Sequence, residues 1–253
     1  ADVLPTDTAD SEDSGVPDSG CGSDSGDEPT PAFYEQSEIE LAYVGPASLS
    51  DFVYWVVVMG AFSSETSCPS FGWIEDDHAR LTGGCTDSSG TTFGGTVDLL
   101  FDSGDGITYS FTDWTHHNAA GVNVVYTMNG SIVNSSETGV RTNGTFGVIR
   151  NSWLDTVEYR FTDFVFSSLI DMMNAQSSAG GSYTGTGRVE VVGIGEFTVD
   201  YSVTEFGLCE SERDELILGM NGDLETITYT QSSDSCDGCT DWSTSSRSGT
   251  ICD

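Results

Sequence analysis

Hydrophobic and polar residues alternate along most of the chain after Cys85, with the two-residue period of half-buried β-strands. The alternation predicts eight strands: Gly95–Phe101, Ile107–Trp114, Val122–Met128, Gly144–Arg150, Val157–Phe166, Arg188–Val192, Phe197–Phe206 and Leu224–Thr230. Short connectors rich in Gly, Asn and Asp favour antiparallel hairpins over parallel crossovers; they are Asp102–Gly106, Asn129-Gly130, Asn143-Gly144, Gly193–Gly195 and Asn221-Gly222. We therefore expect a mainly β fold, a long antiparallel β-meander that forms a curved sheet or a sandwich.

Two segments break the alternation and predict one or two short helices. From Ala47 to Phe62 the chain is almost entirely apolar, and Ser48 followed three residues later by Asp51 resembles a capping box at a helix start. The valines and aromatic residues of this run suit a fully buried strand equally well, because periodicity does not separate the two in so short a run. A buried helix is the interpretation we adopt. Ser167–Ala175 predicts a second, short helix.

One strand motif occurs three times, as Tyr-x-Phe/Val-Thr-Asp/Glu-aromatic. The copies are Tyr109–Trp114, Tyr159–Phe164 and Tyr201–Phe206. With a two-residue period, Tyr109, Phe111 and Asp113 share one face of the sheet, and Trp114 lies on the other. The motif thus predicts an inner aromatic row that ends in an acid, with a ring covering the far face. In the alternative interpretation the three final rings, Trp114, Phe164 and Phe206, form an aromatic face that binds a ligand such as a glycan.

The charge of the chain restricts its partners. It contains no lysine, and seven arginines stand against 41 aspartates and glutamates, for a formal net charge of −34. Nucleic acid and anionic membrane surfaces are excluded as electrostatic partners, because binding them requires a positive footprint. The longest apolar run, Phe52–Met59, is far shorter than the roughly 20 residues that a membrane helix needs. Cations are the partners that such a surface attracts.

Seven cysteines indicate an oxidising compartment, where such sets form disulfides. Spacing pairs Cys68 with Cys85 and predicts two bridges among Cys209, Cys236, Cys239 and Cys252, whose connectivity stays open. Cys21 is then left over, either as a free or capped thiol or as a bridge between subunits. The chain begins at Ala1 without a methionine or an apolar leader, from which we expect that a secretory signal has been removed. Together these features predict an extracellular or cell-surface protein.

Composition divides the chain into two parts. Residues 1–32 are rich in Asp, Ser, Gly, Pro and Thr, and have few large apolar side chains to offset the entropy of ordering. We expect an acidic, low-complexity N-terminal tail there. Residues 33–253 hold most of the aromatic and aliphatic residues, and we expect them to form a single β-rich domain.

Calcium is the ligand that the acidic turns suit best. Asp102 and Asp105 place two carboxylates and several carbonyl groups in one tight loop, the oxygen ligands that hard cations prefer. The loop does not match an EF-hand, and a merely solvated turn is the alternative. Four thiolates around Cys236-Asp-Gly-Cys239 would suit zinc, but disulfides are the expected fate of these cysteines outside the cell.

Nothing in the sequence predicts catalysis. The histidines are His78, His116 and His117; we expect the adjacent pair on a surface loop, and no Gly-x-Ser-x-Gly elbow accompanies them. The sequons at Asn129, Asn134 and Asn143 lie in predicted turns, where the same residues also serve hairpin chemistry. We expect no enzyme, and a secreted hydrolase is the least supported alternative.

Two segments resemble a known class of proteins. They are Ser67-Cys-Pro69 continuing to Gly83-Gly-Cys-Thr-Asp-Ser-Ser-Gly-Thr91, and Cys236-Asp-Gly-Cys239 with the final Cys252. Together they resemble an acidic, cysteine-containing class of predicted cell-surface or secreted proteins of myxobacteria and their relatives. The resemblance implies an exported β-rich domain behind an acidic leader, and it implies no activity.

These observations predict an extracellular structural protein that associates with copies of itself. Long antiparallel strands can add strands at their edges, and a heterologous contact that does not close propagates into a filament, a sheath or a surface layer. Because each copy carries −34, assembly is expected to depend on divalent cations or on high salt. A secreted, monomeric glycan-binding or adhesion module is the alternative.

Overall fold

The structure of the chain is a computed structural model that describes residues 33–62, 67–103, 106–118, 124–135, 138–150, 157–167, 181–205, 215–232 and 239–252. These residues form one helix, α1 (Gln36–Phe62), and fourteen strands. The strands are β1 (Ser70–Glu75), β2 (His78–Thr82), β3 (Cys85–Thr86), β4 (Thr92–Asp102), β5 (Gly106–Asn118), β6 (Val124–Ser135), β7 (Gly139–Arg150), β8 (Val157–Phe166), β9 (Gly181–Val191), β10 (Gly195–Glu205), β11 (Glu215–Gly222), β12 (Thr226–Ser232), β13 (Cys239–Ser243) and β14 (Ser248–Cys252). The expected mainly β meander is confirmed.

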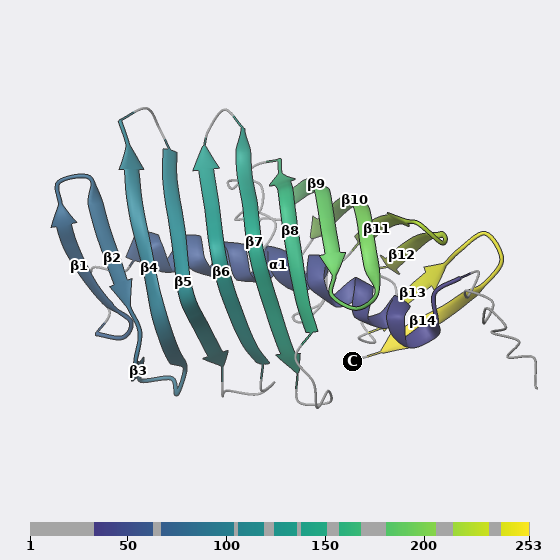
Figure 1. Ribbon diagram of the computed structural model, residues 1–253, viewed down its shortest axis with the longest axis horizontal. Coiled ribbons are helices and arrows are strands. Elements are labelled where there is room, and N and C mark those ends of the chain that lie inside the picture. The colour runs from purple at the N-terminus through teal and green to yellow at the C-terminus, as the bar shows by residue number, and fades with distance from the viewer. Residues whose placement is uncertain are drawn as a thin grey trace, which may run out of the picture. The chain divides into compact units, whose positions relative to one another are not determined.

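All the strands belong to one antiparallel sheet, in which neighbours follow chain order from β1 to β14 and β3 pairs with β4 beside this path. Figure 1 shows the strands in this order, with α1 running across them on one face of the sheet. Side chains alternate between a buried face, which packs on α1, and an exposed outer face rich in Thr and Ser. The core therefore lies between a single helix and one face of a single sheet.

The sheet encloses the helix from more than one side. The Tyr229 hydroxyl donates to the carbonyl of Ile39 at 2.6 Å, and the Tyr159 hydroxyl donates to the carbonyl of Leu41 at 2.8 Å. These two carbonyls belong to residues two apart, which lie on nearly opposite sides of the helix axis. The tyrosines come from β12 and β8, and the sheet must therefore curve around α1 to bring both hydroxyls to it.

The helix is longer than the sequence predicted, and it starts earlier. It begins near Glu35, whose N–H donates to the Glu38 carboxylate at 2.7 Å. The expected capping residue Ser48 is instead buried in the interior of the helix. Every residue from Val44 to Ser50 is buried, as expected for a helix covered on all sides. Small residues permit this packing, since a Cβ on Gly45 would lie 2.3 Å from the Tyr159 ring.

Two of the predicted turns are wrong. Asn129-Gly130 and Asn143-Gly144 lie in the middle of β6 and β7, where Gly130 pairs directly with Gly144. Of the second predicted helix, Ser167–Ala175, only Ser167 falls within the described residues. The turn at Gly193–Gly195 is confirmed, because it joins β9 to β10.

Two β-bulges interrupt the ladder at equivalent places in β5 and β8. The register shifts between Phe111 and Trp114 in β5, and between Thr162 and Val165 in β8. At each bulge an aspartate has left-handed backbone geometry, with φ of 47° at Asp113 and 49° at Asp163. A bulge bends its strand and increases the local twist. Both bulges therefore help this long sheet to curve around the helix.

The bulges reverse the faces that the repeated motif was expected to show. Asp113 adds one residue, so Trp114 returns to the buried side with Tyr109 and Phe111, and the carboxylate lies on the exposed side. The predicted separation of the ring from the other aromatic residues is therefore wrong in the first two copies. In the third copy the ladder keeps a regular register as far as Glu205, and Phe206 lies outside the described residues.

Candidate functional site: the open edges of the sheet

The two outermost strands of the sheet, β1 and β14, are its candidate functional surfaces. Among the strands that the structure describes, each of them has a neighbour on one side only. An edge strand presents unpaired N–H and C=O groups, to which another strand can add. The two edges differ in chemistry, and this difference decides what each can bind.

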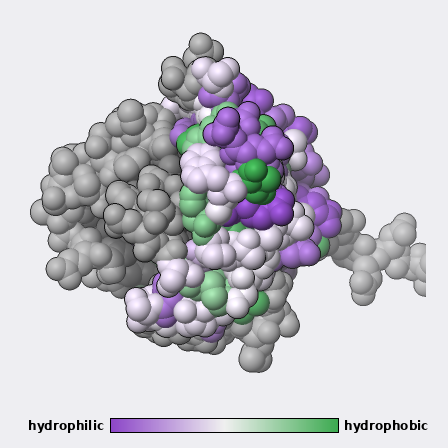
Figure 2. Space-filling model, turned by 90° about the vertical axis from the view of Figure 1, so that its left-hand side faces the viewer, coloured by the Kyte–Doolittle hydropathy of each residue, from purple (hydrophilic) through white to green (hydrophobic). Residues whose placement is uncertain are grey.

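The β1 edge is apolar and exposed. Trp73 is 60% exposed and Ile74 is 48% exposed, the two most accessible large hydrophobic side chains in β1. The Trp73 ring packs edge-on against Phe71 at 5.6 Å between centroids, and lies 5.3 Å from Phe101 of β4. Figure 2 views this end of the molecule and shows hydrophobic residues set among hydrophilic ones. These rings continue the buried aromatic face to the open end of the sheet.

The β14 edge is polar. Ser248, Thr250 and Cys252 are exposed, and Gly249 and Ile251 are half-buried. A disulfide joins Cys252 to Cys239, the residue directly opposite it in β13, with 4.1 Å between the Cα atoms. This edge offers backbone groups without the exposed large hydrophobic side chains that β1 carries.

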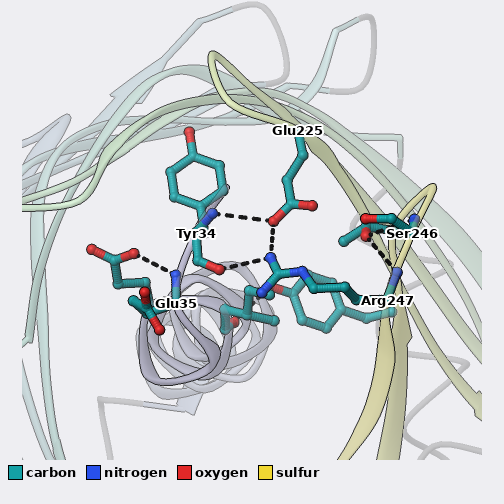
Figure 3. Close-up of polar contacts among 9 residues, drawn as sticks. Tyr34, Glu35, Glu225, Ser246 and Arg247 are labelled. Carbon is teal, nitrogen blue, oxygen red and sulfur yellow. Dashed lines mark hydrogen bonds and ion pairs between the residues drawn. The ribbon is translucent and has the colours of Figure 1, made fainter. Parts of the chain in front are cut away.

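A partly buried ion pair links the start of the helix to the residue that precedes β14. The guanidinium of Arg247 pairs with the Glu225 carboxylate, whose side chain is only 9% exposed, and donates to the Tyr34 carbonyl at 2.7 Å. The Tyr34 N–H donates to the same carboxylate at 3.2 Å, and the guanidinium lies 4.2 Å from the Phe33 ring centroid. Figure 3 shows these groups converging beside the helix. The cluster holds the chain where it enters the core, and we assign it a structural role.

A second polar group lies beside β1, on the outer face. Asp98 accepts hydrogen bonds from Arg80 Nε at 2.7 Å and faces His78 Nε2 at 2.9 Å. The hydrogen bond from Arg80 holds the pKa of the Asp98 carboxyl below its usual value, and the hydrogen bond from His78 acts in the same direction. Both side chains are partly exposed, and ion pairs in such positions add little to stability. Arg80 lies opposite Gly72, so its guanidinium is the positively charged group next to β1.

The aromatic face proposed from the repeat is not accessible. Trp114 is 1% exposed and Phe164 is 0% exposed, and both rings lie in the core. A ring that stacks on a sugar must be exposed to solvent, so these two residues do not form a binding surface. Phe206, the third ring, is outside the described residues.

The asparagines of two sequons hold the bulges. Asn129 Oδ1 accepts the N–H of Asp113 at 2.7 Å, and Asn143 Oδ1 accepts the N–H of Asp163 at 2.8 Å. Both asparagines lie within long strands and not in turns. Their amides thus have a local structural role that explains why Asn precedes Gly at both places.

The histidine pair lies in β5, and the expectation of a surface loop is wrong. His116 is buried, and its ring stacks on Phe93 at 5.3 Å with an interplanar angle of 14°. Burial lowers the pKa of His116 to about 4, an effect that the Asp87 charge opposes in part and His117 reinforces. A buried, neutral imidazole packed among rings is a core residue.

The calcium prediction is only partly covered by the structure. Asp102 ends β4 and is exposed, and Asp105 lies outside the described residues. Within the described ranges no three His, Cys, Asp or Glu side chains are grouped as metal ligands. Calcium at Asp102 and Asp105 stays a prediction.

The structure describes two disulfides, one of which the sequence predicted as a pair. Cys68 pairs with Cys85 as predicted, with 5.8 Å between the Cα atoms, and closes the loop that holds β1 and β2. The Cys239–Cys252 bridge decides part of the connectivity that the sequence left open, and it removes both residues from any four-thiolate zinc site. The remaining cysteines, Cys21, Cys209 and Cys236, lie outside the described residues.

Comparison with known protein families, curated proteins and solved structures gives no match for this chain. Among the described residues, no helix combines the length and the apolar character that crossing a bilayer requires. The function must therefore be argued from the geometry of the chain itself.

Proposed function

We propose that this chain is an extracellular structural protein that associates with copies of itself through the edges of its sheet. The observation that carries the proposal is the β1 edge, a strand with a neighbour on one side and with Trp73 and Ile74 exposed. Natural proteins protect edge strands with charges, prolines or bulges, because an exposed apolar edge pairs with other strands. An edge that keeps a large exposed ring is suited to association.

The charge of the chain sets the conditions for association. Two copies at −34 each repel one another, and this repulsion falls as salt screens it or as cations bind. Edge pairing buries backbone groups and apolar rings, which salt does not weaken in the same way. Association is therefore expected to increase with ionic strength, and divalent cations are expected to act at lower concentrations than sodium.

The covalent structure is compatible with a secreted protein. Two disulfides lie within the described part of the chain, and disulfides persist in oxidising compartments. The glycan-binding alternative loses its proposed surface, because Trp114 and Phe164 are buried. Self-association is the function that the exposed groups support best.

The test is light scattering and negative-stain imaging of the intact chain across titrations of NaCl, CaCl₂ and a chelator. The expected result is reversible growth of scattering with salt or calcium, with extended or layered particles in the images. A protein that stays monomeric at every salt and calcium concentration would refute the proposal.

Matched variants link the assembly to the edge. Trp73→Thr removes the exposed ring on β1, and Ile217→Thr removes an apolar side chain of similar exposure, 45%, from the outer face of β11. Loss of one central aromatic contact costs about 1–2 kcal/mol at an interface, so the association constant is expected to fall by about 5- to 30-fold in Trp73→Thr. Ile217→Thr is expected to assemble as the parent does.

A further inference from the structure

We infer that two copies associate through their β1 strands, antiparallel to each other, about a two-fold axis beside Gly72. This inference rests on the proposed self-association and identifies one of the surfaces that perform it. A two-fold contact closes at a dimer, so extended particles require a second contact elsewhere on the molecule. The partner is thus a second copy of the same chain, presenting the same strand. Three features of the described residues lead to this arrangement: the directions of the edge strands, the position of the acids, and the faces of the rings.

The directions of the edge strands exclude one kind of contact. β14 of one copy and β1 of the next cannot pair as antiparallel strands while the helix-covered faces of both sheets lie on the same side. With β3 off the path, thirteen strands lead from β1 to β14, and each is antiparallel to the next. Because thirteen is odd, β1 and β14 point in the same direction. If β14 of one copy met β1 of the next with the helix-covered faces on the same side, the two strands would be parallel. A two-fold axis normal to the sheet instead pairs β1 with β1 as antiparallel strands, which are slightly more stable.

The charges of β1 favour the same arrangement. Its C-terminal end continues into three exposed acids, Glu75, Asp76 and Asp77, whereas its N-terminal end, Cys68–Ser70, is uncharged. With Gly72 opposite the partner's Gly72, Glu75 faces the partner's Pro69. Each acidic end then lies against the neutral end of the other copy. Parallel alignment of two β1 strands would place the acids side by side, which destabilises a strand pair.

The faces of the rings fit this register. Phe71 pairs with Leu81 and Trp73 with Ala79 in β2, so both rings lie on the helix-covered face of the sheet. An axis at Gly72 sets Phe71 against the partner's Trp73, and does so twice by symmetry. Cross-strand aromatic pairs contribute about 0.2–1 kcal/mol each relative to a pair of alanines. Nothing lies within 4 Å of a Cβ built on Gly72, so the outer face at the centre of the contact is unobstructed.

The contact is small, and this determines its strength. Complete burial of a Trp side chain removes roughly 150–250 Å² of surface from water. Trp73 is 60% exposed, so the contact can bury at most that part of its surface. The register shift between Trp73 and Glu75 also limits regular pairing to about four residues. An interface of this size belongs to the weak, transient class. The dimer is therefore expected at high protein concentration and high salt.

Disulfide trapping tests the register directly. Gly72→Cys in a Cys21→Ser background places two thiols at the two-fold axis, where opposite Cα atoms in an antiparallel pair lie about 4.5–5.5 Å apart. Ser202→Cys, an exposed position on the outer face of β10, is the matched control. Under mild oxidation at high NaCl, Gly72→Cys is expected to form the covalent dimer at least tenfold faster than Ser202→Cys. Ser248→Cys on β14, mixed with Gly72→Cys, reports a head-to-tail contact.

The outcomes separate this inference from the proposed function. Faster trapping of Gly72→Cys, lost when Trp73→Thr is added, supports the β1 contact even where scattering shows no particle beyond a dimer. Equal trapping of Gly72→Cys and Ser202→Cys, or preferred trapping between positions 72 and 248, overturns it. In that case assembly seen by scattering would still support the proposed function, with a different contact.

Discussion

Acid is expected to destabilise this protein through His116, even though acid relieves the repulsion among its carboxylates. The His116 ring is 5% exposed and is packed against Phe93 and Tyr126. Burial lowers its pKa from 6.5 to about 4 in the folded protein. The unfolded chain therefore takes up a proton at a higher pH than the folded protein does, and protonation favours unfolding.

The size of the effect follows from these two pKa values. The stability that depends on neutral His116 is fully present above pH 6.5 and is lost as the pH falls toward 4. Linkage gives a loss of about 1.4 kcal/mol at pH 5.5 and about 2.5 kcal/mol at pH 4.5, relative to pH 8. Domains are stable by about 5–15 kcal/mol, so the loss is large enough to measure.

The assay is urea unfolding of the parent and of His116→Phe between pH 8 and pH 4.5, followed by tryptophan fluorescence. His116→Phe keeps a ring against Phe93 and has no proton to gain, and the carboxylates that titrate are the same in both proteins. At pH 8 the difference in free energy of unfolding between the two proteins reports only the effect of the substitution on packing. Between pH 8 and pH 4.5 the free energy of unfolding of the variant should rise by about 2.5 kcal/mol relative to that of the parent. A difference that stays constant within about 0.5 kcal/mol would refute the reasoning.

Two further predictions concern the core and the start of the helix. Gly45→Ala pushes a methyl group into the Tyr159 ring and should cost about 1–3 kcal/mol in thermal or urea unfolding, whereas Gly72→Ala, with open space around it, should change stability by less than about 0.5 kcal/mol. Equal effects of the two changes would contradict the packing described. Arg247→Met leaves the Glu225 carboxylate buried without its partner and should cost about 3 kcal/mol. The double change Arg247→Met with Glu225→Leu should restore most of that loss, and a double variant as unstable as the single one would show that the ion pair is not the cause.

The strands and their order were the most predictable part of the fold. Alternation marked the segments, as the structure confirms for β4, β5 and β8. Short polar connectors indicated antiparallel neighbours, as the structure confirms for β4 with β5 and for β9 with β10. Asn-Gly was misleading, because the side chain of Asn129 holds a bulge in the preceding strand and that of Asn143 holds a bulge in the following strand. A hairpin turn and a bulge clamp use the same residues, and only the neighbouring strand distinguishes them.

The start of the helix was hidden by residues that normally end helices. Gly45 and Pro46 stand inside α1, and Pro cannot donate the hydrogen bond that its position requires. Contacts from β8, β10 and β12 stabilise the helix there, including a 3.3 Å contact between Ser50 Oγ and the Tyr201 hydroxyl. Tertiary packing therefore outweighed local propensity, which no window of sequence could show.

The candidate site was beyond prediction for a related reason. The sequence drew attention to Trp114 and Phe164, which the bulges turn into the core, and passed over Trp73, which lies at the edge. Which strand becomes an edge depends on the order of all the strands in the sheet, and not on the composition of that strand.

By itself the sequence determined the class of the fold, the net charge, and one of the two disulfide pairs that the structure describes, because alternation, ionisable groups and cysteine spacing can be read without knowing which residues meet in space. The tertiary structure alone decided which rings are buried and which edge is open. One inserted residue reverses every side chain that follows it in a strand, and that reversal is stabilised by hydrogen bonds from a neighbouring strand.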